Sequence, residues 1–407
     1  MRRVRAMAIG AVLTVAAATS AAATDAGDWP AVLQEARGQT VYFNAWGGSA
    51  PINAYLGWVG DTVKAQFGVS LVQVKLDDTS HAVATVVAEK AAGKTDGGAV
   101  DLIWINGENF AAMKSQNLLW SPGWATLLPN WRLVDVTNQP TVREDFTLPT
   151  EGLESPWGGA KLVFFYDSAR LTAAELPDST ADILTFAQNH PGRFSYPQPP
   201  DFLGTTFLKQ VLSEVIDDRT KLTRPVDPAR FAADVAPLFA YLDRLHPLLW
   251  RQGKTFPKTG PDLQQKLADG ELDISFAFNP GEASAAIVGG QLPTTVRSFS
   301  FSGGTLGNSH FVAIPFNATA KAGALVVANF LLSPAAQRRK QDPGIWGDPT
   351  VLAMERLTPS ERAAFAGLDL GVATLAPAAL GPVLPEPHPD WMVKIEAEWQ
   401  RRYGGGQ

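Results

Sequence analysis

Cysteine is absent from the 407 residues, which excludes disulfide bonds, thiolate metal sites and cysteine nucleophiles. The five histidines show no HExxH spacing, and no GxSxG elbow occurs. Ser309 and His310 are adjacent, but neighbours on a strand point to opposite faces and do not easily share a proton. We therefore predict no metal, no cofactor and no catalytic residues.

Long apolar runs are also missing, except at the N-terminus. Arg2, Arg3 and Arg5 precede an apolar run over residues 6–18, and three alanines at 21–23 offer a small-residue cleavage site. This order is typical of a secretory signal peptide. Because a bilayer span needs about 20 apolar residues, we predict cleavage after residue 23 rather than anchoring in a membrane.

Basic charge is in short supply. The formal net charge is −6, and removing the three arginines of the predicted signal peptide takes it to −9. Such a chain is a poor partner for nucleic acid or for an anionic membrane. Hydrophobic residues make up 45% of the chain, which is enough for globular cores, and 407 residues are too many for one ordinary core. The sequence thus predicts a soluble, periplasmic protein with two lobes.

Three strand-helix units open the mature chain. Predicted strands at 40–45, 69–76 and 101–105 are each followed by a turn and an amphipathic helix. Consecutive β-α units are typical of a doubly wound sheet with right-handed crossovers. Residues 121–157 are irregular and contain five prolines, so we place a linker or hinge there. Further predicted helices cover 178–189, 208–215, 231–250, 259–268, 320–332 and 390–403, and further strands cover 161–166 and 272–278.

Polar residues follow each of the first three strands. They are the WGGS turn at 46–49, Asp78-Thr79, and the Asn106–Asn109 turn. In an open α/β sheet this edge is where ligands bind, and free N–H groups at helix starts favour negative charge. Each turn taken alone is more typical of a capped helix start. The hypothesis of a binding site depends on the rest of the chain.

Three stretches resemble the extracytoplasmic solute-binding proteins of ABC importers, of the large two-lobed class. They are DLIWINGENFAAMKSQNLL at 101–119, KLVFFYDSARL at 161–171, and SHFVAIPFNATAKAGALVVANFLLSPAAQ at 309–337. The third is the most specific, because strand, helix and SPAAQ occur in one order. Within this class, the motifs FNAWGGS and GLESPWGGAKLVFFYD are similar to those of an uncharacterised branch near the thiamine, polyamine and iron binders.

The resemblance implies an α/β fold of two doubly wound lobes with a hinge, the periplasmic binding protein type 2 fold. Lobe 1 would comprise residues 24–152 and 303–340, and lobe 2 residues 153–302 and 341–407. It also implies a monomer that traps a small molecule at the hinge and delivers it to an ABC permease in the inner membrane. Glu108, Asn109 and Tyr166 match ligand-contact positions of the family, whereas Asp167 departs from the commoner asparagine.

Turn positions and the resemblance together define the candidate site. The predicted ligand-binding residues are Trp46, Gly48, Ser49, Asp78, Thr79, Asn106, Glu108, Asn109, Trp157, Tyr166, Tyr196, Asp201, Thr205, Asn279, Glu282, His310 and Trp346. For each tryptophan the competing interpretation is core packing. Aromatic faces and carboxylates suit an organic cation or a thiamine-like compound. The glycine turn favours an anion, and a zwitterion or phosphorylated cation would satisfy both.

Three other functions stay open at the sequence level. An exported hydrolase or lyase acting on a carbohydrate through cleft carboxylates is the first alternative, since two carboxylates suffice for that chemistry. A metal carrier is the second, but iron carriers of this class use tyrosine clusters, and the six tyrosines here include no adjacent pair. A structural or adhesive exported protein is the third, disfavoured by the lack of internal repeats.

Overall fold

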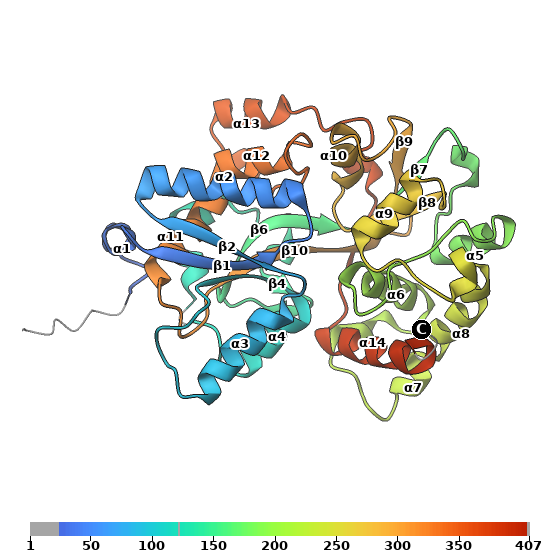
Figure 1. Ribbon diagram of the computed structural model, residues 1–407, viewed down its shortest axis with the longest axis horizontal. Helices are drawn as coiled ribbons and strands as arrows, with labels where there is room; N and C mark the ends of the chain where they lie inside the picture. Colours follow the sequence, from blue (N-terminus) through green and yellow to red (C-terminus); the bar gives the residue numbers. More distant parts are fainter. Residues whose placement is uncertain (1–23, 121–122, 405–407) are drawn as a thin grey trace, which may run out of the picture.

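The computed structural model describes residues 24–120 and 123–404. The predicted signal peptide lies outside the described residues. Within the described ranges, no helix is long and apolar enough to cross a membrane. The chain forms two α/β lobes lying side by side and joined by extended segments (Figure 1).

The first lobe is built on a mixed sheet with the order β11-β10-β3-β1-β2, and β6 also pairs with β10. β1 pairs in parallel with β2 and β3, because helices carry the chain back between these strands. β10 returns antiparallel to β3. The strands are β1 (Thr40–Trp46), β2 (Ser70–Leu76), β3 (Leu102–Ile105), β6 (Glu154–Lys161), β10 (Thr305–Ala313) and β11 (Val383–Pro385).

Helices cover both faces of this sheet. α2 and α11 pack on the face that carries Phe43 and Val312, whereas α3 and α4 pack on the face that carries Ile103 and Ile105. A short hairpin of β4 (Glu144–Asp145) and β5 (Leu148–Pro149) lies beside the sheet. The helices of this lobe are α1 (Trp29–Ala36), α2 (Ala50–Phe67), α3 (Ser80–Ala91), α4 (Gly107–Ser115), α11 (Lys321–Leu331), α12 (Pro334–Gln341) and α13 (Pro359–Ala366).

The second lobe has a smaller antiparallel sheet with the order β8-β7-β9. Its core is rich in aromatic residues, and Phe164 of the central strand contacts the rings of Phe276, Phe299 and Phe301. The strands are β7 (Val163–Asp167), β8 (Ile274–Ala277) and β9 (Val296–Phe299). The helices are α5 (Thr180–Asn189), α6 (Phe202–Val215), α7 (Phe231–Asp234), α8 (Ala236–Leu245), α9 (Gly260–Ala268), α10 (Glu282–Val288) and α14 (Pro389–Tyr403).

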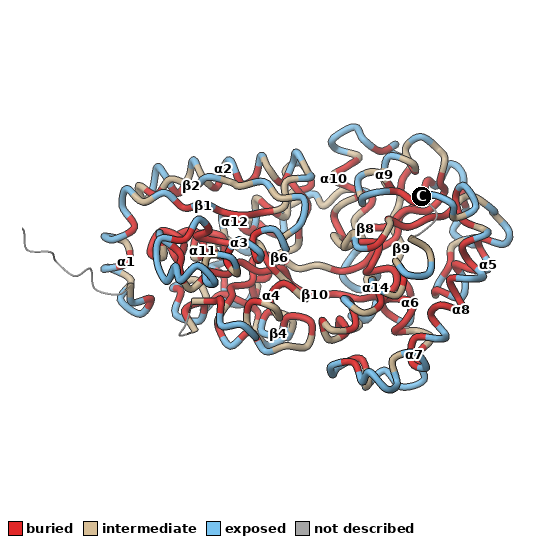
Figure 2. The backbone as a smooth tube through the Cα atoms, turned by 60° about the horizontal axis from the view of Figure 1, so that its bottom comes forward, coloured by how far each residue is buried: buried red, intermediate tan, exposed pale blue. Residues whose placement is uncertain are grey.

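β6 and β10 pass between the lobes as an antiparallel ribbon. Their register runs from Ala313 opposite Glu154 to Gly307 opposite Lys161, and it shifts between His310 and Phe311. The chain crosses again after α13, where β11 pairs with β10 and leads to α14 in the second lobe. Each lobe has its own buried interior, shown in red in Figure 2. The lobes are therefore separate packing units linked by few strands, an architecture that permits hinge motion.

The structure differs from the prediction at several boundaries. The segment predicted as a linker packs into the first core through Trp124 and Val142, and β6 makes the crossing instead. The predicted helix at 231–250 is interrupted, because proline at 237 and at 247 lacks the N–H that a helix interior needs. Trp346 and Phe365 pack into the first core, whereas Ala373 and α14 pack in the second lobe. Assigning all residues after 340 to lobe 2 therefore does not describe their packing.

Candidate functional site

The loops after β1 and β3 lie at the edge of the first sheet that faces the second lobe (Figure 1). α4 begins immediately after β3, so its first turn is placed at this edge, and α4 contacts α14 of the second lobe. Glu108 lies in that first turn and accepts a hydrogen bond from the Asn109 amide (Nδ2 to Oε1, 2.7 Å). Burial raises the pKa of Glu108 to about 7, and the charges of Glu396 and Asp78 add to the rise.

Carboxylates of the second lobe lie opposite. Glu396 of α14 accepts a hydrogen bond from Thr205 Oγ1 at 2.7 Å, and burial raises its pKa to about 7. Asp201 caps the start of α6, and burial raises its pKa to about 6. The charge of Asp78, from the first lobe, contributes to both of these rises. We call Asp78, Glu108, Asp201 and Glu396 the interlobe carboxylates.

Lys209 is the basic residue whose charge acts on Glu108 and Glu396. Its ammonium is fully buried and pairs with Glu386 (Nζ to Oε2, 2.7 Å). The same ammonium lies 4.2 Å from the centre of the Phe146 ring, which comes from the first lobe. Because Lys209 is paired with Glu386, its charge offsets only part of the repulsion among the interlobe carboxylates.

A cluster of rings surrounds His310 of the hinge ribbon. Trp104, Trp157 and Trp346 are mutually in contact, with centroid distances of 4.9 Å for Trp104–Trp157 and 5.3 Å for Trp157–Trp346. His310 stacks on Trp346 at 5.8 Å, with an angle of 13° between the ring planes. Trp157 and Trp346 are almost fully buried, whereas Trp104 is partly exposed.

His310 is held by a buried polar network. Its Nε2 lies 3.1 Å from Asp348 Oδ2, and the same carboxylate pairs with Lys340. A Cβ on Gly158 would collide with both the His310 ring and the Asp348 carboxylate, so only glycine fits at this point of β6. The network therefore ties both strands of the hinge ribbon to the segment after α12.

The turn after β8 brings the lobes into direct contact. The Gly281 backbone lies so close to the Gly347 backbone that a Cβ on either would clash with the other. Asn279 Oδ1 accepts from the Gly281 amide at 3.0 Å. Burial raises the pKa of Glu282 to about 7, and the charge of Asp348 adds to this. Glu282 of the second lobe and Asp348 of the first thus repel each other across the lobes.

Of the remaining predicted residues at this edge, some make local contacts and others leave their side chains unused by their own helices. The Trp46 ring folds over Gly48, where a Cβ would collide with the indole. Thr79 Oγ1 donates to the Trp104 carbonyl at 3.2 Å. Ser49 and Asn106 occupy the N-cap positions of α2 and α4 without a side-chain capping bond. Their side chains are thus not used by their own helices.

The prediction of ligand contact is wrong for Tyr196. This residue is fully buried in the second core, where its hydroxyl bonds His246 Nε2 at 2.7 Å and receives the Trp399 indole N–H at 2.8 Å. The Tyr166 ring packs against Phe299 in the same core, and ligand contact through its hydroxyl stays a prediction. For Tyr196, the aromatic character that suggested ligand contact reflects core packing.

Sequence reasoning missed several residues at the interface. Lys209, Glu386, Glu396 and Asp348 lie in helices or loops with no motif around them, and only the packing of the lobes brings them to this edge. Asn308 of β10 is 5% exposed, and both polar atoms of its amide lack a hydrogen-bond partner among the described residues. An unpaired buried amide commonly meets a ligand or ordered water. Asn308 directly precedes the stretch at 309–337 that resembles the family, and this position was the one available signal.

Two α/β lobes on a strand hinge, with polar groups facing each other between them, define the periplasmic binding protein class. Among the described residues, no group of three or more His, Asp or Glu side chains is placed to hold a metal ion. The family model described as bacterial extracellular solute-binding protein matches residues 58–352, and the chain belongs to this family. It is 48% identical over 382 residues to Protein YnjB of Escherichia coli strain K12, covering 94% of this chain and 95% of that one.

Solved structures share the fold at low sequence identity. A putative spermidine/putrescine ABC transporter protein from Listeria monocytogenes aligns with a TM-score of 0.63 at 14% identity, covering 90% of this chain and 99% of that one. The periplasmic binding protein AfuA from Actinobacillus pleuropneumoniae, with bound fructose-6-phosphate, gives 0.59 at 15% identity, with coverages of 90% and 99%. Iron-bound HitA from Pseudomonas aeruginosa gives 0.58 at 15% identity, with coverages of 88% and 98%.

Proposed function

We propose that this protein is the periplasmic solute-binding component of an ABC importer. In this role it is exported with removal of the signal peptide, acts as a monomer, closes on a small polar ligand between its lobes and delivers it to a permease in the inner membrane. Family membership and the fold of its structural neighbours support the transport role. The hinge ribbon of β6 and β10 supports closure, because two strands with a register shift join otherwise separate cores.

The ligand we propose is an organic cation, with thiamine-like compounds among the candidates. The observation behind this choice is the set of interlobe carboxylates, which come from both lobes. Among the described residues, the basic residue whose charge acts on Glu108 and Glu396 is Lys209, and it is paired with Glu386. The pKa values of Glu108, Asp201 and Glu396 are raised because burial and repulsion by neighbouring carboxylates disfavour ionisation. A bound cation would relieve that repulsion, and the partly exposed Trp104 and Trp46 rings offer faces for cation–π contact.

The neighbours' ligands do not transfer to this chain. Their names mention fructose-6-phosphate, spermidine/putrescine and iron, which differ in charge sign and size. One scaffold therefore hosts several kinds of ligand through its loops. The carbohydrate hydrolase or lyase that the sequence leaves open finds no support, since family and fold are those of transport proteins.

Mass spectrometry of molecules that co-purify with gently isolated protein is the most direct test of the ligand. A thermal-shift panel of thiamine and its phosphates, polyamines, amino acids, sugars and oxyanions complements it. A ligand at a thousandfold excess over its Kd stabilises the folded state by about 4 kcal/mol. We expect the response from cations. A panel in which only anions or neutral sugars respond would refute the cation proposal, while the binding role would stand.

A further inference from the structure

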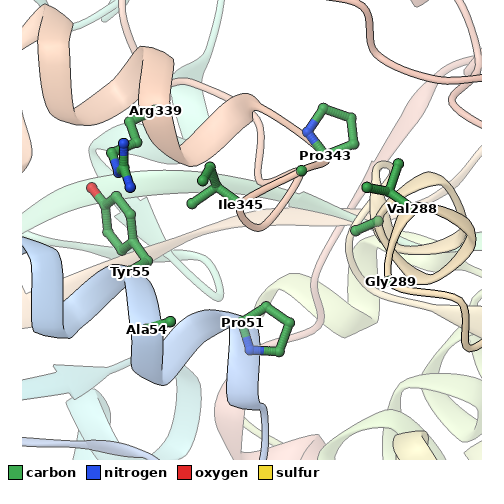
Figure 3. A pocket seen from close by; sticks show the side chains of 10 residues that line it. Pro51, Ala54, Tyr55, Val288, Gly289, Arg339, Pro343 and Ile345 are labelled. Atoms are coloured by element: carbon green, nitrogen blue, oxygen red, sulfur yellow. The ribbon is translucent and has the colours of Figure 1, made fainter.

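A groove separate from the interlobe carboxylates opens between α2, α10 and the turn after α12. It has a volume of about 270 Å³. Its lining comes from three segments. α2 contributes Ala54 and Tyr55, the end of α10 contributes Val288, and α12 with the turn after it contributes Arg339 and Pro343 (Figure 3). α2 and α12 belong to the first core and α10 to the second, so the groove has walls from both lobes.

The chemistry of the lining is one-sided. Among the residues that the structure describes, Arg339 is the only charged one in the lining, and no carboxylate lines the groove. Arg339 Nε is buried and has no hydrogen-bond partner among the described residues, while the guanidinium lies 4.7 Å from the Trp58 ring. Tyr55 already donates its hydroxyl to the Ala336 carbonyl at 3.1 Å. No carboxylate of the described residues forms an ion pair with Arg339, so a ligand carboxylate in the groove would supply its counter-charge.

The groove is also polarised along its length. Arg339 and Tyr55 lie together at one end, whereas Pro343 and Val288 form the other (Figure 3). Val288 is 62% exposed, an unusual exposure for a large aliphatic side chain at a concave surface.

We propose that this groove is a second binding site, for a small monocarboxylate with an apolar body. The carboxylate pairs with Arg339, and the body covers Val288 and Pro343. Because the walls come from both lobes, the site exists only in this arrangement of the lobes. An occupant therefore holds the lobes together. The proposal goes beyond the transport function and is independent of the imported ligand.

Ligand-observed NMR titration of the whole protein with benzoate and with butyrate tests the site, with butylamine as the cationic counterpart. We expect saturable binding of both carboxylates and none of the amine at this site. Arg339→Gln should weaken binding about tenfold or more, the loss expected when a charge-assisted hydrogen bond is removed. Arg338→Gln is the matched control, since this neighbouring arginine is exposed and does not line the groove.

Ala54→Leu provides a second test that leaves the arginine in place. Ala54 is exposed on α2, so leucine there fills the groove without entering the core. We expect it to abolish benzoate binding with an unchanged circular dichroism spectrum. Absence of saturable carboxylate binding to the unmodified protein would overturn the proposal. So would binding that survives Arg339→Gln and Ala54→Leu, or that Arg338→Gln weakens equally.

Discussion

Replacing Glu108 by glutamine should stabilise the ligand-free protein at pH 8. Burial raises the pKa of Glu108 from 4.5 to about 7. A carboxyl with a raised folded-state pKa keeps a proton that the unfolded chain releases, so between about pH 4.5 and 7 the stability falls as pH rises. Glutamine resembles the protonated carboxyl, retains an oxygen that can accept from Asn109, and avoids the cost of burying a charge.

The magnitude follows from the pKa difference. A difference of about 2.5, at about 1.36 kcal/mol for each pKa unit, gives about 3 kcal/mol at pH 8 as an upper limit. Glu396 and Asp78 share the repulsion and can relax, so we expect about 1–3 kcal/mol. The gain should disappear near pH 4.5 and below, where the carboxyl is protonated in both states.

Urea unfolding followed by tryptophan fluorescence, at pH 8, 7, 6 and 5, measures this gain. Glu355→Gln is the control, because that glutamate is exposed in the 3₁₀ turn Met354–Arg356 of the same lobe. Glu108→Gln should raise the urea midpoint at pH 8 and have little effect at pH 5. A lower midpoint at pH 8, or an equal change at both pH values, would refute the account of the interlobe carboxylates.

Ionisation of Glu108, which destabilises the ligand-free protein, should favour the binding of a cation. A cation that requires Glu108 ionised should bind about tenfold more weakly at pH 6 than at pH 8, since a group with a pKa of about 7 is mostly protonated at pH 6. Calorimetry in two buffers of different ionisation enthalpy would show proton release on binding. Affinity independent of pH, with no proton released, would remove Glu108 from the site.

Three further predictions concern the interface, the hinge and the ligand site. Lys209→Met leaves the buried Glu386 unpaired and should cost about 3–5 kcal/mol in urea unfolding, part of which the additional Glu386→Leu change restores. Gly158→Ala should lower Tm and abolish the response to ligand. Gly159→Ala is the control and should be tolerated, because a Cβ there has no neighbour nearer than 3.5 Å. Equal effects of the two substitutions would disprove the steric argument. Trp46→Ala should weaken ligand binding with little change in Tm, because the ring is partly exposed, and a collapse of the fold would place it in the core.

Much of the fold is written in short-range pattern. Runs such as VYFNA and DLIWI are apolar and β-branched, and glycine or proline marks the turns, so β1, β2, β3 and the helices between them are found close to the expected positions. Where local pattern fails, tertiary contacts decide. The segment 124–149 has no periodicity of its own, yet it packs on the first core.

The candidate site divides in the same way. Turns after strand ends are recognisable from sequence, which is why Glu108, Asp78 and Asp201 were predicted at the interface. Glu396 and Lys209 carry no local signal, because a carboxylate or ammonium on a helix is ordinarily solvated. Only the packing of α14 and α6 against the first lobe removes water from them and shifts their role from surface charge to interlobe electrostatics.

Sequence alone thus determined the α/β units and the polar turns, because each depends on residues that are close in the chain. The tertiary structure decided which charges face one another across the lobes, and it placed Tyr196 in a core rather than at the ligand. Burial and long-range Coulomb interactions depend on distances in space, and the chain reaches those distances only once both lobes have packed.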